Sequence, residues 1–150
     1  MSKEAKKTDN NPEFVIQNIY LEEVNHKSHL VPHRIKEKWE PNAHVDVKTR
    51  FDALTESDYE VGIKVKVNVK IKDQDVFDIY VHHSGVFGLK NFSDEQREHL
   101  LESYCPTILL PYARHKVSDV VQLAGFPPLY IAPVDFEAKY QERKQKEKKN

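Results

Sequence analysis

Histidine side chains are the residues of this 150-residue chain that could most readily bind a metal. Eight are present, and His29, His33 and the adjacent His82 and His83 could in principle supply ligands. Pro32 lies between the first two and removes the helical register that would place both rings on one face. Adjacent residues of a strand point to opposite sides, so the second pair should also diverge. Surface or packing roles suit these histidines better, and we expect no metal and no cofactor.

The single cysteine, Cys105, could act as a nucleophile only if its thiolate were stabilised. Pro106 follows it and offers no backbone N–H for that purpose, so we expect a small buried hydrophobe. The four glycines do not form a phosphate-binding loop, and Ser84 lacks the glycine two residues earlier that a serine-hydrolase elbow requires. We therefore expect no enzyme, and an enzyme using His82 or His83 is a remote alternative.

Strand patterns dominate the first two thirds of the chain. Apolar and polar residues alternate strictly over residues 61–71, which predicts a strand with one buried and one solvated face. Turn residues at 73–75 and a second alternation over 76–87 predict an antiparallel hairpin. Residues 14–21 and 45–51 also have strand composition. We expect a four-stranded antiparallel sheet.

Helix signals follow the sheet. Ser93 and Gln96 have the spacing of a capping box, and Pro106 should end this helix and start the next. The second helix ends at Gly125, and a last helix begins near Pro133 and dissolves into the Lys-rich end. Strands followed by helices predict an α+β fold with the helices packed on one face of the sheet.

The second predicted helix carries a long apolar stripe. It is long enough to serve a partner chain as well as its own sheet, so we expect a homo-oligomer. The alternative is that the stripe packs only on its own sheet. The stripe consists of Leu110, Ala113, Val117, Val120, Val121 and Ala124.

Charge divides the chain into three parts. The net charge is -1, but residues 137–150 carry +3 and residues 1–12 carry +1, which leaves an acidic body of -5. The basic end is a weak signal for nucleic acid, which we do not expect as a partner. We predict a flexible lead over residues 1–12, one domain over 13–140 and a basic, flexible end over 141–150. Without a long apolar run, we expect no membrane insertion and a cytoplasmic location.

Aromatic residues suggest a binding role. As a set they fit a groove for extended polypeptide, in which backbone hydrogen bonds give affinity and shallow pockets accept varied side chains. For any single member, core packing is the more ordinary role. The set comprises Trp39, Phe77, Phe87, Tyr112, Phe126, Phe136 and Tyr140.

Several sequence blocks closely resemble the bacterial export chaperone family SecB over residues 14–140. The most specific is Tyr104-Cys105-Pro106-x-Ile108-Leu109-x-Pro111-Tyr112-Ala113-Arg114. The others are Ile19-Tyr20, Trp39-x-Pro41, Tyr59-Glu60-Val61, Gly85-Val86-Phe87, and Gly125-x-Pro127-x-Leu129 leading to Ala132-Pro133-Val134-Asp135-Phe136.

The resemblance implies a homotetramer, built as a dimer of dimers, that works without ATP. SecB proteins hold unfolded secretory precursor proteins in a translocation-competent state and pass them to the SecA ATPase. The matching client-binding positions here are Trp39, Phe77, Ile79, Val81, Tyr112 and Tyr140. The matching SecA-docking positions are Glu23, Lys27, Asp78 and Tyr80.

The docking positions depart from the family pattern. Lys27 replaces an acidic residue, and Asp78 and Tyr80 replace an apolar and an acidic residue, whereas Glu23 keeps its acidic type. A charge reversal at an electrostatic contact reduces complementarity. Two interpretations stay open: a chaperone that delivers precursors to SecA, or a SecB-like chaperone for dedicated clients with weak or altered SecA docking.

Overall fold

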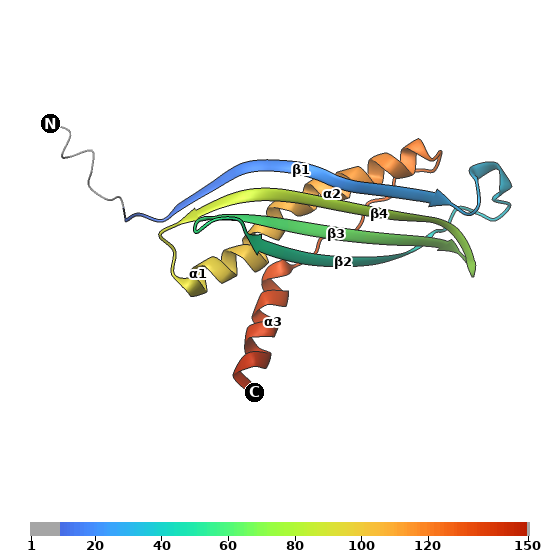
Figure 1. Ribbon diagram of the computed structural model, residues 1–150. Helices are drawn as coiled ribbons and strands as arrows, with labels where there is room; N and C mark the ends of the chain where they lie inside the picture. Colours follow the sequence, from blue (N-terminus) through green and yellow to red (C-terminus); the bar gives the residue numbers. More distant parts are fainter. Residues whose placement is uncertain (1–9, 150) are drawn as a thin grey trace.

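The structure, a computed structural model, describes residues 10–149 and consists of one sheet followed by helices (Figure 1). The strands are β1 (Glu13–Ser28), β2 (Asn42–Ala53), β3 (Asp58–Ile71) and β4 (Gln74–Lys90). They pair antiparallel in the order β1-β4-β3-β2, so β1 and β2 are the edge strands. The predicted α+β fold and its four-stranded antiparallel sheet are confirmed.

Register in the sheet follows the alternation of the sequence. Val65 pairs with Val81 of β4 on one side and with Val47 of β2 on the other, which places apolar side chains on one face. β1 pairs with β4 through two register shifts, at Gln17 and Glu22. Each is a β-bulge, which bends the strand and increases its local twist.

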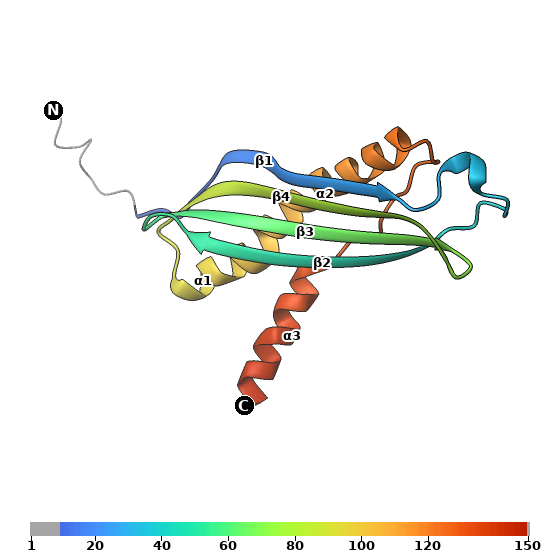
Figure 2. The same ribbon diagram turned by 45° about the vertical axis from the view of Figure 1, so that its right-hand side comes forward.

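The helices after β4 form one continuous rod, which is seen most clearly in Figure 2. It comprises α1 (Asp94–His99), a π-helical turn (Leu100–Tyr104) and α2 (Cys105–Leu123). The capping box is confirmed, because the Gln96 N–H donates to Ser93 Oγ and the Ser93 N–H donates to Gln96 Oε1.

The predicted helix break at Pro106 was wrong. The Cys105 N–H donates to the Leu100 carbonyl, so the helix widens to a π turn directly before the proline. A regular turn would press the proline ring against the carbonyl four residues earlier, and the wider turn relieves that clash. The sequence Cys105-Pro106 is therefore accommodated inside a helix.

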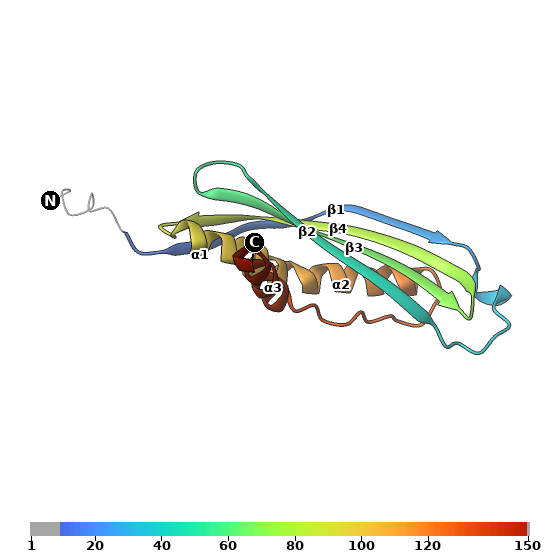
Figure 3. The same cartoon turned by 90° about the horizontal axis from the view of Figure 1, so that it is seen from below.

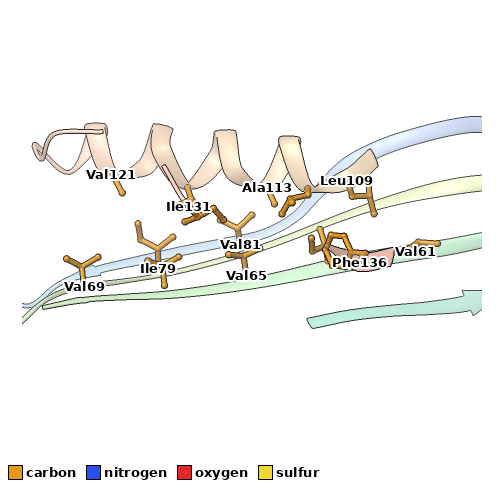
Figure 4. Close-up of a cluster of buried hydrophobic side chains, with 14 of the residues drawn as sticks. Val61, Val65, Val69, Ile79, Val81, Leu109, Ala113, Val121, Ile131 and Phe136 are labelled. Atoms are coloured by element: carbon orange, nitrogen blue, oxygen red, sulfur yellow. The ribbon is translucent and has the colours of Figure 1, made fainter. Parts of the chain in front are cut away.

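α2 covers one face of the sheet, and Figure 4 shows the packed side chains. Leu109, Ala113 and Val117 of α2 are completely buried, as are Val65 and Val81 of the strands. Burial of such side chains stabilises the fold by roughly 1.5–3 kcal/mol each. Among the described residues, no helix covers the other face, as Figure 3 shows from below. We call this other surface, with Lys64, Lys66, Asp78 and Tyr80, the open face.

α3 (Phe136–Lys149) runs away from the sheet after an extended connection. Asp135 caps it by accepting the Ala138 N–H at Oδ1, 2.9 Å away. The helix continues past Tyr140, so the basic end that we predicted as flexible is helical as far as Lys149. Most of the predicted flexible lead, residues 1–9, lies outside the described residues. No helix in the described part of the chain is both long and apolar enough to span a membrane.

Candidate functional site

A groove runs along the free edge of β2. The extended connection between α2 and α3 lies beside this edge (Figure 3). A hollow of about 470 Å³ lies between the two. Val45 and Val47 of β2 line one side, and Leu129, Ile131 and Val134 of the connection line the other. We call this hollow the edge groove. A polypeptide in extended conformation could pair with the unpaired backbone of β2 and place alternate side chains against these apolar residues.

Sequence reasoning did not identify the edge groove. The alternation over residues 45–51 predicted a strand, but only the strand order shows that β2 is an edge. The connection has no periodicity, and nothing in its composition places it beside β2. The proline and apolar residues of the connection were the one feature of the sequence that could have indicated a binding role for it.

An aromatic cluster lies on the segments that precede the two sides of the edge groove along the chain. Trp39 precedes β2 and stacks on Phe126, with ring centroids 5.3 Å apart and an interplanar angle of 18°. Phe126 in turn contacts Phe77, at 5.0 Å between centroids. Phe77 and Phe126 are buried, whereas Trp39 is half-buried. Two of the predicted client-binding residues, Trp39 and Phe77, are therefore brought together by Phe126.

The other four predicted client-binding residues lie elsewhere. Ile79 and Val81 are buried beneath α2. Tyr112 is exposed on α2, where its ring lies 5.6 Å from that of His83. Tyr140 is buried on α3 and stacks on His99. These residues do not share one surface with the aromatic cluster, and their role in client binding stays a prediction.

Hydrogen bonds anchor α3 to the helix that precedes it. Glu137 accepts hydrogen bonds from Gln141 (2.8 Å) and Ser103 (2.7 Å), and its carboxylate lies 2.6 Å from His99 Nε2. Together these contacts lower the pKa of Glu137 to about 2. Arg143 makes a bidentate pair with Glu102, through contacts of 2.6 and 2.7 Å, and also contacts Glu98. The basic end is thus held by acidic residues of α1 and the π turn.

The four predicted SecA-docking residues gather on the open face. Lys27 lies opposite Asp78 in the β1–β4 ladder, Tyr80 lies two residues from Asp78 on β4, and Glu23 lies four residues from Lys27 on β1. A hollow of about 590 Å³ is lined by Lys27, Asp78 and Tyr80. Asp78 accepts a hydrogen bond from Asn68 and contacts His29, both at 2.6 Å, and these contacts lower its pKa. The structure therefore places these four positions on one surface.

A polar network crosses the middle of the open face. Arg50 donates to Glu60 at 3.0 Å and contacts Glu22 at 3.5 Å, while the Tyr20 hydroxyl donates to Glu60. His82 Nδ1 lies 2.9 Å from Glu22, the residue at the second bulge of β1. Burial and the Glu60 carboxylate raise the pKa of Tyr20 to about 12. The network links β1 to β2 across the two central strands, which no local sequence pattern indicated.

The predicted interface stripe lies mostly inside the chain. Leu110, Ala113, Val117 and Val121 are buried against their own sheet, and only Val120 and Ala124 are partly accessible. For those four residues, this placement agrees with the alternative prediction that the stripe packs on its own sheet.

A different apolar surface is accessible on β1. Val15, Ile16, Leu21 and Val24 are each 39–46% exposed along a free sheet edge. Monomeric proteins rarely leave a long apolar edge strand uncovered, so β1 is a candidate interface. The strand pattern of this segment was predicted, but its position at an edge was not.

Cys105 and the paired histidines behave as the sequence indicated. Cys105 is completely buried, and burial raises its thiol pKa to about 12, so the predicted small buried hydrophobe is confirmed. His82 lies on the open face and His83 faces α2, so the two rings diverge. Within residues 10–149, no group of three or more His, Cys, Asp or Glu side chains is arranged to hold a metal ion.

Comparison with known proteins agrees with this architecture. The family described as preprotein translocase subunit SecB matches residues 7–147. Protein-export protein SecB of Nitrosococcus oceani is 36% identical over 135 residues, which cover 89% of this chain and 82% of the relative. The same protein of Burkholderia lata is 37% identical over 135 residues, covering 90% and 84%.

A solved structure shows the same fold. It is the Mycobacterium tuberculosis Rv1957 SecB-like chaperone in complex with a ChAD peptide from the Rv1956 HigA1 antitoxin. It superposes with a TM-score of 0.68 at 19% identity and covers 81% of this chain and 91% of its own. From the family match and the curated relatives, the chain belongs to the SecB family and is a protein-export chaperone.

Proposed function

We propose that the protein is an ATP-independent holdase that binds unfolded precursor proteins along the edge groove and delivers them to SecA. The observation that carries this proposal is the free edge of β2 beside an apolar connection, with the half-buried Trp39 at one end. An extended chain gains backbone hydrogen bonds there whatever its sequence, at roughly 0.5–1.5 kcal/mol each. A folded protein offers no such strand.

Holding a chain unfolded needs no chemical step. A binder that takes the unfolded state and not the folded state draws the population toward the unfolded state by mass action. The groove supplies apolar side chains and the unpaired backbone groups of β2 for this purpose. The action is that of a binding protein in the cytoplasm rather than of an enzyme.

The proposed assembly is a homotetramer, a dimer of dimers. The exposed apolar residues of β1 support it, because a second copy could cover them and pair with the free edge of the strand. Val120 and Ala124 are the members of the α2 stripe that remain accessible enough to take part.

SecA is the proposed acceptor, and the open face is its proposed docking surface. Glu23, Lys27, Asp78 and Tyr80 lie together there, which supports one shared contact. The alternative is a chaperone for dedicated clients with weak or altered SecA docking, which Lys27 favours. The solved structure from Mycobacterium tuberculosis is that of a SecB-like chaperone in complex with a peptide from an antitoxin.

Measuring SecA affinity for the protein and for a Lys27→Glu variant distinguishes delivery to SecA from a chaperone for dedicated clients with weak or altered SecA docking. Restoring the acidic residue should tighten SecA binding if this surface docks SecA. Weaker binding of the variant would contradict the assignment of this surface.

Photocrosslinking tests the location of the client. The photoreactive residue p-benzoylphenylalanine replaces Tyr130, which is 76% exposed and lines the edge groove. The control replaces Tyr104, which is 51% exposed and contacts Phe14 at the opposite edge of the sheet. We expect crosslinks to an unfolded precursor from position 130 only. Crosslinks from position 104 alone would place the client elsewhere.

A further inference from the structure

Three lysines lie together on the open face, and none of them forms an ion pair within residues 10–149, although Lys66 lies opposite Asp46 in the ladder. Lys48 of β2 lies directly opposite Lys64 of β3, and Lys66 follows on the same face of β3. Among residues 10–149, no carboxylate oxygen lies within 4.0 Å of any of their amines. We call these three residues the lysine triad. Like charges directly opposite each other in a ladder destabilise a sheet.

Most acids near the triad are already engaged. Glu22 and Glu60 contact Arg50, and Asp78 contacts His29 and Asn68. The triad lines a hollow of about 410 Å³ together with Tyr80, Glu23 and Asp46, so three ammonium groups face two carboxylates there. This local excess of positive charge lies on a body whose net charge is negative.

We propose that the open face docks an acidic polypeptide segment, whose carboxylates pair with the lysine triad. Lys64 and Lys66 are two residues apart in a strand, so their side chains start roughly 6.6 Å apart. Acidic residues at alternate positions of an extended segment have the same spacing and could pair with both. Tyr80 offers the segment an aromatic surface within the same hollow.

A polypeptide fits this surface better than a polyanion. Glu23 and Asp46 lie in the same hollow as the triad and would repel the dense charge of a nucleic acid or an anionic membrane. A segment with a few carboxylates can approach the lysines and avoid the two acids. The inference goes beyond the SecA docking proposed above, because it assigns a separate acidic partner to lysines of β2 and β3, whereas Glu23 and Lys27 lie on β1.

Fluorescence anisotropy of the full chain tests the proposal. The probe is a fluorescein-labelled peptide of alternating Glu and Thr, and the matched peptide has Lys in place of Glu. We expect the Glu peptide to bind at least about tenfold more tightly, and binding to weaken as salt rises. Lys64→Glu should reduce Glu-peptide affinity about tenfold, because it removes one charge pair and introduces a charge repulsion. Lys36→Glu, an exposed lysine outside the sheet, should leave it within about twofold.

A second readout separates docking from folding. Lys48→Gln should raise the melting temperature, because it removes the like-charge pair with Lys64, and should still weaken Glu-peptide binding. A lower melting temperature for Lys48→Gln, with Glu-peptide affinity unchanged, would assign the lysines a structural role and overturn the proposal.

Each of the other possible outcomes either supports or overturns the docking inference. Equal or tighter binding of the Lys peptide overturns the inference, as does tighter binding of a single-stranded oligonucleotide or of phosphatidylserine vesicles through the same lysines. Retention of an unfolded precursor is measured on the same samples. If the protein holds the precursor but not the Glu peptide, the docking inference fails alone. If it binds the Glu peptide through the triad but not the precursor, the docking inference stands and the holdase proposal fails.

Discussion

Trp39 stacks on Phe126, with ring centroids 5.3 Å apart, and thereby fixes the segment before β2 to the segment after α2. These two segments lead directly into the two sides of the edge groove. Offset aromatic pairs contribute about 0.5–1.5 kcal/mol beyond the area that they bury. The stacking therefore ties together the two segments from which the sides of the groove continue.

Replacing Trp39 should weaken client binding. Trp39→Ala removes the one half-buried ring of the aromatic cluster, and we expect the Kd for an unfolded precursor to rise about tenfold, equivalent to about 1.4 kcal/mol. Trp39→Phe keeps an aromatic ring and should lose much less. Since Trp39 is the only tryptophan, its fluorescence in the wild-type protein should also change when a precursor binds. An unchanged Kd for the alanine variant would remove the aromatic cluster from the client site.

A charge in the edge groove should have a similar effect. Val47→Asp places a carboxylate where the groove is apolar, and we expect at least about tenfold weaker precursor binding because the carboxylate must be desolvated when the client covers it. Thr49→Asp is the matched control, two residues further on the same strand and outside the groove lining. Isothermal titration of both variants checks the prediction. If the two substitutions weakened binding equally, the client would not follow β2.

The sequence predicted the strands and the capping box because their signals are local. Alternation over residues 61–71 requires only neighbouring positions, and Ser93 with Gln96 spans one helical turn. The edge groove could not be predicted in this way, because it depends on the strand order that places β2 at the edge. The family resemblance supplied Trp39 and Phe77, but Phe126, which joins them, was recognised only as one member of an aromatic set.

Two features of the structure differ from what the sequence predicted, and each difference has a physical reason. The break expected at Pro106 does not occur, because a π turn absorbs the proline without ending the helix. The Lys-rich end continues as helix because Arg143 pairs with Glu98 and Glu102, which are 45 and 41 residues away in sequence. Charge counted along the chain cannot show pairing between residues that are distant in sequence. For this reason the sequence alone suggested a separate basic end.

Removing Arg143 should loosen α3. Arg143→Ala breaks its pairs with Glu98, Glu102 and Glu147, and we expect the free energy of unfolding to fall by about 1 kcal/mol, since the pairs are partly exposed. Hydrogen exchange of α3 should accelerate at the same time. Lys146→Ala is the control, because this exposed lysine pairs with no acid among the described residues. Equal exchange rates in the two variants would show that Arg143 does not anchor the helix.

Glu137 should make stability depend on acid pH. Its pKa falls from an ordinary value of 4.5 to about 2, because the folded state donates hydrogen bonds to the charged carboxylate. The contribution is complete above about pH 4.5 and is lost as the pH falls toward 2. Urea unfolding at pH 6 and pH 3 should therefore show a smaller loss of stability for Glu137→Gln than for the wild-type protein. Identical losses would mean that the carboxylate gains nothing from Ser103, Gln141 and His99.

Native mass spectrometry of the protein with a slow-folding precursor tests the central claim most directly. The precursor is offered once in its unfolded form and once after folding, and the masses report assembly and client preference together. We expect a tetramer that binds the unfolded precursor and does not bind the folded one, without ATP. Equal occupancy by both forms, or by neither, would contradict the assignment of this chain as a holdase.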